Sequence, residues 1–157
     1  MGGATAAANA SNPSYVALFN NANYAEALMV RWWNCWSPNT ITMNWYLAQT
    51  NLGGTAITLV NFVPNDTPPP GLMTSGNAAG LSTAGIQLRF LTNANFSWNI
   101  PVPFCLVPPG WSLIANGGTA NNAFSASMFW EAVKPEQLDE GAWLQANAAL
   151  LNAQNGQ

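Results

Sequence analysis

The chain has 157 residues, of which 49% are hydrophobic, 11% aromatic and only 6% charged, with a formal net charge of −3. A chain of this length suits a single domain with a sizeable core. Three basic residues and the lack of histidine exclude a phosphate-binding surface for nucleic acid, histidine-based catalysis and most transition-metal sites.

The surface is expected to be polar but nearly uncharged, because 21 asparagines take the place of many of the usual charged residues. Charges keep monomers apart, so a chain with few of them tolerates association. We therefore expect much of the surface to be covered by partner molecules. The alternative is a soluble monomer with an amide-rich coat.

Residues 1–13 are small and polar, and they are expected to form a flexible N-terminal arm. The first fourteen residues, MGGATAAANASNPS, contain neither the basic region nor the apolar region of a secretory signal. No run of about 18 apolar residues occurs, so no membrane-spanning helix is expected. The sequence therefore predicts a protein that is made in a cytoplasm and does not enter a membrane.

Four strands are predicted in the first half of the chain. SYVALFN (14–20) is the first, and EALMVRWWNCW (26–36) is long and mostly apolar, as is typical of a central strand covered on both faces. TITMNWYLA (40–48) alternates between apolar and polar residues, which indicates a half-buried strand. The β-branched segment TAITLVNFV (55–63) is the fourth.

The segment RWWNCW (31–36) packs three tryptophans into six positions. Side chains of a regular strand alternate between its two faces. One face would then carry Leu28, Val30, Trp32, Asn34 and Trp36. The other would carry Met29, Arg31, Trp33 and Cys35. One face is expected to belong to the core, and the face with the charge of Arg31 is expected to be covered by a loop or a second subunit.

The second half begins with PNDTPPPGLMTSGNAAGLSTAG (64–85), which has too many prolines and glycines for a regular element and is predicted to be a long loop. IQLRFLT (86–92) resumes the alternation of a strand. FSWNIPVPFCLVPPG (96–110) is extended, but its prolines confine it to an edge or a loop. Two further strands are predicted, WSLIAN (111–116) and FSASMFWEAV (124–133).

From residue 134 onward the composition changes. Carboxylates cluster near the start of the last segment and alanine and leucine follow, which predicts a C-terminal helix or arm over 134–157, attached to a β body over 14–133. Such a helix would be apolar over much of its circumference, so we expect it to pack on a neighbouring subunit with Trp143 as its anchoring ring. About eight short strands predict an all-β fold, an antiparallel two-sheet sandwich that is jelly-roll-like.

No catalytic, cofactor-binding or metal-binding residue is predicted. Neither of the common glycine-rich phosphate motifs occurs. Glu131 could pair with Glu26 or Asp66 for hydrolysis, which stays a third hypothesis behind two non-enzymatic ones. Cys35 and Cys105 are expected to be reduced and buried, because no secretory signal points to an oxidising compartment. One disulfide between them is the alternative.

The eight tryptophans are the best clue to function. Trp45, Trp111 and Trp130 lie on apolar registers and are expected in the core. A second set is less committed to the core and is predicted to form an interface: Trp36, Tyr46, Phe129, Trp143 and Leu144. Rings around a subunit axis would serve assembly. Rings along an open groove beside asparagine would suit sugars, which stack on aromatic faces and bond to amides.

The run PVPFCLVPPGWSLIANGGTANNAFSASMFWEAV (101–133) resembles the last part of small β-sandwich virion proteins of tailed bacteriophages, among them the capsid decoration or cement proteins. The shared pattern is a PPG bend, a short strand, a glycine-rich turn and a final strand ending in Trp-Glu. It covers about a fifth of the chain. The resemblance implies a homotrimer on the exterior of the virion capsid, bound to the major capsid protein where hexamers meet and stabilising the shell.

Two functions from different classes follow from these observations. The first is a non-enzymatic structural virion protein, a capsid decoration protein that acts through subunit contacts and needs no cofactor. The alternative is a carbohydrate- or receptor-binding module of a phage tail fibre or of a lectin-like protein. The position of the uncommitted aromatic residues is the feature that separates the two.

Overall fold

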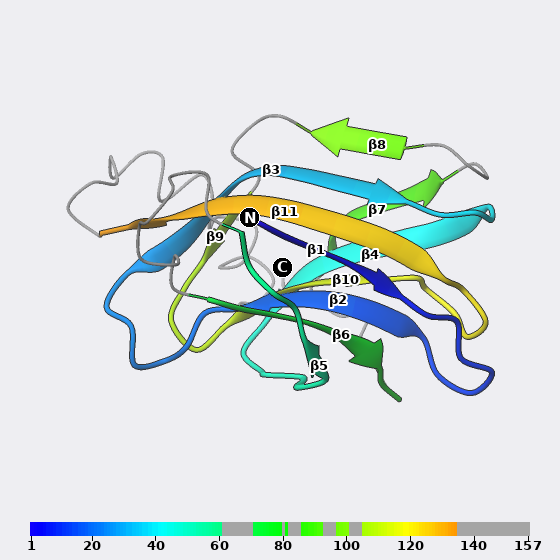
Figure 1. The fold of residues 1–157 in the computed structure, drawn as a ribbon, viewed down its shortest axis with the longest axis horizontal. Helices are drawn as coiled ribbons and strands as arrows, with labels where there is room; N and C mark the ends of the chain where they lie inside the picture. Colours follow the sequence, from blue (N-terminus) through cyan, green and yellow to red (C-terminus); the bar gives the residue numbers. More distant parts are fainter. Residues whose placement is uncertain (61–70, 80, 82–85, 93–96, 101–104, 135–157) are drawn as a thin grey trace, which may run out of the picture.

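The computed structural model of the chain describes residues 1–60, 71–79, 81, 86–92, 97–100 and 105–134. These residues form eleven strands and no helix, arranged as two antiparallel sheets that pack face to face (Figure 1). The part of the chain that is described therefore contains no helix long and apolar enough to cross a membrane. The predicted all-β two-sheet sandwich is confirmed.

Sheet A has five strands and sheet B has six. The order in sheet A is β1 (Gly2–Ala6), β11 (Phe124–Val133), β3 (Ala27–Trp36) and β8 (Ser97–Ile100), with β9 (Cys105–Val107) also paired to β3. The order in sheet B is β5 (Thr55–Ala56), β6 (Leu72–Asn77), β2 (Ser14–Phe19), β10 (Ser112–Asn116), β4 (Ile41–Ala48) and β7 (Ile86–Thr92).

The strand pairs are nested along the chain. β1 pairs with β11, β2 with β10, β3 with β8 and β9, and β4 with β7. The first half of the chain thus pairs in reverse order with the second half, and successive pairs alternate between sheets A and B. A long antiparallel hairpin wrapped in this way is a jelly roll. The short strands β5 and β6 extend sheet B beyond β2.

Two segments in the middle of the chain differ from the secondary structure expected of them. Of the strand predicted over 55–63, residues 61–63 lie outside the described residues, and within 55–60 only β5 is a strand. Beyond β5, the Ile57 amide donates a hydrogen bond to the Met73 carbonyl (2.9 Å). The loop predicted over 64–85 contains β6, which pairs with β2 over its full length. The small and polar residues of β6 hide it from a sequence pattern, because its place in the sheet comes from hydrogen bonds with the distant strands β2 and β5.

The N-terminal residues were expected to form a flexible arm over 1–13, but the structure places Gly2–Ala6 in sheet A as β1. Small residues are required there. A Cβ atom on Gly2 would lie 2.6 Å from Met73 Sδ and 2.9 Å from Leu59 Cδ2. Because the backbone itself fills the gap against the core, the strand carries no apolar alternation that a sequence pattern could reveal.

The core lies between the sheets, and two tryptophans from opposite sheets meet at its centre. The ring centroids of Trp33 on β3 and Trp45 on β4 are 4.4 Å apart, with the rings tilted by 44°. Both side chains are fully buried. Around them pack Leu18, Leu28, Met43, Met73, Leu113, Phe124, Met128 and Trp130. The expected core positions Trp45 and Trp130 are confirmed, and Trp111 packs against the core while staying partly exposed.

A β-bulge on β3 corrects the predicted faces of the RWWNCW segment. In the ladder with β11, Val30 pairs with Trp130 and Trp32 pairs with Phe129, so Arg31 is an extra residue on β3. The extra residue reverses the alternation beyond it. Trp33 and Cys35 therefore join Leu28 and Val30 in the core, whereas Arg31, Trp32, Asn34 and Trp36 lie on the outer face. The prediction that Trp32 and Trp36 share a face with Val30 is wrong.

Several asparagines hold turns together. The Asn9 side-chain oxygen accepts hydrogen bonds from the amides of Ser11 (2.9 Å) and Asn12 (3.0 Å), and that of Asn116 accepts one from the amide of Gly118 (2.8 Å). Asparagine suits this role because its short amide bonds to the backbone two or three residues onward. Part of the asparagine content thus serves the loops of the domain and is not simply a surface coat.

Because of the bulge, two adjacent tryptophans should contribute very differently to stability, which can be tested. Trp33→Ala is expected to lower the free energy of unfolding by about 3–5 kcal/mol, because it leaves a cavity at the centre of the core. Trp32→Ala is expected to cost less than about 1 kcal/mol, because its side chain lies on the outer face. Urea unfolding of the two variants measures the difference. Equal costs, or the reverse order, would show that β3 has no bulge at Arg31.

The two cysteines are buried in the core and form no disulfide. Burial raises the pKa of the Cys105 thiol far above its ordinary value, which suppresses the reactive thiolate. We expect no alkylation of either cysteine in the folded protein and alkylation of both after denaturation without reductant. Mass spectrometry counts the modified cysteines. A denatured, unreduced chain that takes up no label would reveal a disulfide.

Candidate functional site

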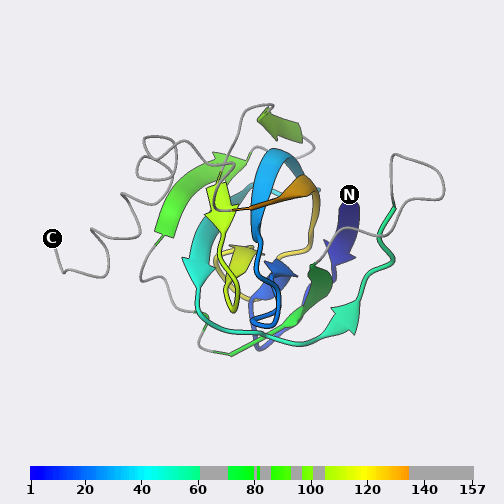
Figure 2. The same ribbon diagram turned by 90° about the vertical axis from the view of Figure 1, so that its left-hand side faces the viewer.

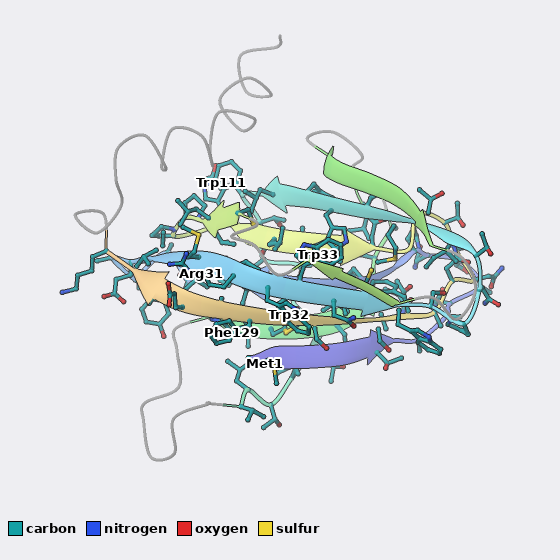
Figure 3. All side chains as sticks on the ribbon, turned by 90° about the horizontal axis from the view of Figure 1, so that it is seen from above. Met1, Arg31, Trp32, Trp33, Trp111 and Phe129 are labelled. Carbon is teal, nitrogen blue, oxygen red and sulfur yellow. The ribbon has the colours of Figure 1, made fainter. Side chains whose placement is uncertain are left out.

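The outer face of sheet A carries a cluster of partly exposed aromatic and charged side chains. We call it the aromatic face and define it by six residues of β3 and β11: Arg31, Trp32, Asn34, Trp36, Phe129 and Glu131. Figure 3 looks onto this side of the molecule, with Arg31, Trp32 and Phe129 labelled on the two strands. Trp32 and Phe129 are register partners, so their rings lie opposite each other across the ladder.

One ion pair stands beside these rings. Arg31 Nε donates a hydrogen bond to Glu131 Oε1 (2.7 Å), and Arg31 Nη2 contacts the same oxygen. The two side chains are 40% and 44% exposed. The pair leaves the aromatic face without net charge, although it uses two of the nine charged residues of the chain. An ion pair this exposed contributes at most about 1 kcal/mol to stability.

The tryptophan rings of this face are not needed to fill the domain core, which Trp33 and Trp45 already occupy. Trp36 is 38% exposed, and Trp32 and Phe129 are partly exposed. Exposed tryptophan beside arginine is the composition of energetically dominant sites in protein interfaces. The face is therefore a candidate surface for contact with another molecule.

A row of hydroxyl groups borders the rings on the side of β1. Ser125 pairs with Trp36 and Ser127 with Asn34 across the ladder between β11 and β3. The Thr5 and Ser125 hydroxyl oxygens are 2.8 Å apart, so a hydrogen bond joins β1 to β11 on this same face. The face thus combines apolar rings with an amide and hydroxyl groups that can bond to a polar partner.

A small apolar cluster lies at the other end of the face. Met29, Leu106 and Val133 are buried together, and Ala27 packs against them. Met29 is the register partner of Glu131, so the cluster adjoins the ion pair. The aromatic face is therefore continuous with an apolar patch at the end where β11 finishes.

The predicted interface residues separate in the structure. Trp36 and Phe129 come together on the aromatic face. Tyr46 does not join them, because it lies on β4 in sheet B, where it is 2% exposed and packs with Tyr15, Ala17 and Ile114. Burial raises the pKa of the Tyr46 hydroxyl, and the polar side chain of Asn116 opposes this rise only in part. Trp143 and Leu144 lie outside the described residues.

Two features of the face were missed from the sequence, namely Trp32 and the pairing of Arg31 with Glu131. Both depend on the bulge, which turns Arg31 and Trp32 to the same side. The charge of Arg31 within an apolar run was the one sign that this strand is not covered evenly on both faces. Nothing in the sequence marks the position of the extra residue.

The groups on the aromatic face can bind by ring stacking, apolar contact and hydrogen bonding. The described residues contain no cluster of three or more His, Cys, Asp or Glu residues that could hold a metal ion. No protein-family model, curated protein or solved structure matches the chain. The geometry of the aromatic face is therefore the basis for a proposed function.

The ion pair is expected to be dispensable for folding. Glu131→Gln removes its charge but keeps the shape of the side chain, and we expect the free energy of unfolding to change by less than about 1 kcal/mol. Arg31→Gln should behave in the same way, and the double variant measures the coupling between the two. A loss of about 3 kcal/mol or more in either single variant would show instead that the pair holds the two strands together.

Proposed function

We propose that the chain is a non-enzymatic structural subunit of a virion, and specifically a capsid decoration protein of a tailed phage. The observation that carries the proposal is the aromatic face, where Trp32, Trp36 and Phe129 stand with an internally neutralised ion pair on the side of sheet A that faces away from the core. The partners in this proposal are other copies of the chain, as a homotrimer, and the major capsid protein.

Physical reasons favour contact with protein at this face. Covering large aromatic rings removes apolar surface from water, which contributes about 25 cal/mol for each Å² buried. Arg31 and Glu131 neutralise each other already, so covering them leaves no unpaired charge in the interface. A chain with 6% charged residues also has little electrostatic repulsion between its copies.

The assignment to a capsid exterior is supported by two further points. Residues 101–133 resemble the closing hairpin of small virion β-sandwiches. The nested strand pairing is that of a jelly roll, a fold used by viral capsid proteins and by lectins. Fold alone does not specify function, so this second point is an analogy.

A second candidate function, binding of a neutral carbohydrate, is favoured by one arrangement on β3. Trp32, Asn34 and Trp36 lie on one face of the strand, with serine hydroxyls opposite Asn34 and Trp36. The two indoles are four residues apart, about 13 Å along the strand. Such a spacing would allow two sugar rings of one chain to stack on the tryptophans while the amide bonds to hydroxyl groups between them.

The proposal predicts that substitutions on the aromatic face weaken assembly. We expect the wild-type chain to sediment as a trimer of about 50 kDa, three times the 16.7 kDa of one chain. Trp32→Ser and Trp36→Ser remove the largest apolar contacts of the face, so each variant should weaken self-association at least tenfold. Sedimentation at micromolar concentration measures this association. Binding of each variant to capsids that lack the protein tests the decoration role.

Tyr24→Ser is the matched control. Tyr24 is 45% exposed but lies in the turn between β2 and β3, away from the aromatic face, so its replacement should leave assembly unchanged. A wild-type monomer that does not bind capsids would overturn the proposal. If that monomer binds glycans on an array and Trp36→Ser removes the binding, the carbohydrate function is correct instead.

A further inference from the structure

We infer that strand β1 is exchanged between copies, so that Gly2–Ala6 of one chain occupies the edge of β11 in a second copy. The inference rests on the proposed function, because exchange requires an assembly. It starts from the position that β1 fills, which we call the β1 slot. The slot is lined by β11, by the side chains of Leu59 and Met73, and by the backbone of Val60. Figure 2 shows β1 at this margin of the sandwich, beside β11.

The β1 slot has to be filled for the core to stay dry. Beneath it, β11 carries Phe124, Met128 and Trp130, all at most 2% exposed. β1 pairs with β11 through five consecutive residues, and its inward side chains pack on the core. Removal of β1 would expose these side chains and leave one edge of the β11 backbone without its partner. An empty slot is therefore unfavourable, whichever chain supplies the strand.

The slot is also selective for the sequence of β1. A Cβ atom at Gly2 would meet Met73 Sδ at 2.6 Å and Leu59 Cδ2 at 2.9 Å, so a larger residue does not fit without rearrangement. Ala6 is 1% exposed and leaves little room for a longer side chain. Met1 adds a pair of backbone hydrogen bonds with Val60, both 2.9 Å. The strand that fits this slot is β1 itself, so the external occupant is a second copy of the chain.

Side chains contribute little to the attachment of β1 to its own body. Its inward residues Gly2, Ala4 and Ala6 bury little apolar surface, and no large side chain anchors the strand. A short connection of small and polar residues, 7–13, joins it to β2. Two backbone hydrogen bonds tie this connection to the body. The one from the Asn121 amide to the Asn9 carbonyl (2.8 Å) would move with β1, and the one from the Ala78 amide to the Pro13 carbonyl (3.2 Å) would stay in place. The hinge of the exchange therefore lies over residues 10–12.

β1 keeps all of its contacts when it is exchanged. The slot offers the same partners to a strand from its own chain and to one from a neighbour. The two arrangements differ in the path of residues 10–12, where the turn hydrogen bonds from the Ser11 and Asn12 amides to Asn9 Oδ1 would open. In an assembly held together by the aromatic face, the neighbouring strand is present at high local concentration. Exchange then links the subunits through backbone hydrogen bonds in addition to side-chain contacts.

A cross-link decides between the two arrangements. Thr5 and Ser125 are register partners with hydroxyl oxygens 2.8 Å apart, so Thr5→Cys with Ser125→Cys places two thiols within reach of a disulfide. Cys35 and Cys105 are buried and should not compete. After oxidation of the assembled protein, we expect most chains to run as covalent multimers on a non-reducing denaturing gel. Disulfides confined to single chains would overturn the exchange.

A mixture of single variants gives an independent measurement. A Thr5→Cys chain and a Ser125→Cys chain, unfolded and refolded together, should form a mixed disulfide if β1 of one chain lies on β11 of the other. Each variant refolded alone sets the background. If the double variant forms an oligomer with only intrachain disulfides, or with none, β1 is not exchanged and the proposed function still stands. A wild-type chain that is a monomer and does not bind capsids overturns both.

Discussion

The contact between Trp33 and Trp45 is the interaction on which the rest of the structure depends. It joins the centres of the two sheets, with ring centroids 4.4 Å apart and both side chains excluded from water. Trp33 reaches this position because the bulge at Arg31 reverses the alternation of β3. Without the extra residue, Trp32 would point into the core and Trp33 would point outward. This one bulge thus places Trp33 at the centre of the core and also turns Arg31 and Trp32 toward the outside.

The bulge therefore links the packing of the core with the proposed contact face. Bulges are frequent near functional sites because they redirect side chains without breaking a sheet. Here the redirected residues are a cation and an indole, and β11 supplies their neighbours Glu131 and Phe129 from the opposite strand. The resulting face is apolar and electrically neutral but retains hydrogen-bonding groups. A large interface can cover such a face without burying an unpaired charge.

The jelly-roll wrap explains why an assembly role is compatible with such a small and weakly charged domain. The nested pairing makes β1 the outermost partner of the last strand, at the margin of sheet A. An outermost strand can be supplied by another chain without altering the strand order inside the jelly roll. Contacts through the aromatic face and through the β1 slot would act on the same sheet, so each can reinforce the other by holding neighbouring copies at high local concentration.

The amino-acid sequence by itself determined the fold class, the main strands and the low charge of the surface. Alternation in 40–48 and 124–133 is a local property that survives any arrangement of the sheets, and each of these segments is a strand. The tertiary structure decided what depends on long-range pairing. β1 and β6 are strands because distant partners supply their hydrogen bonds, although their own residues are small or polar. It also decided which tryptophans of RWWNCW face outward. The register of β3 against β11 depends on two segments about a hundred residues apart in the chain. The pattern of residues around two consecutive tryptophans does not indicate which of them is buried.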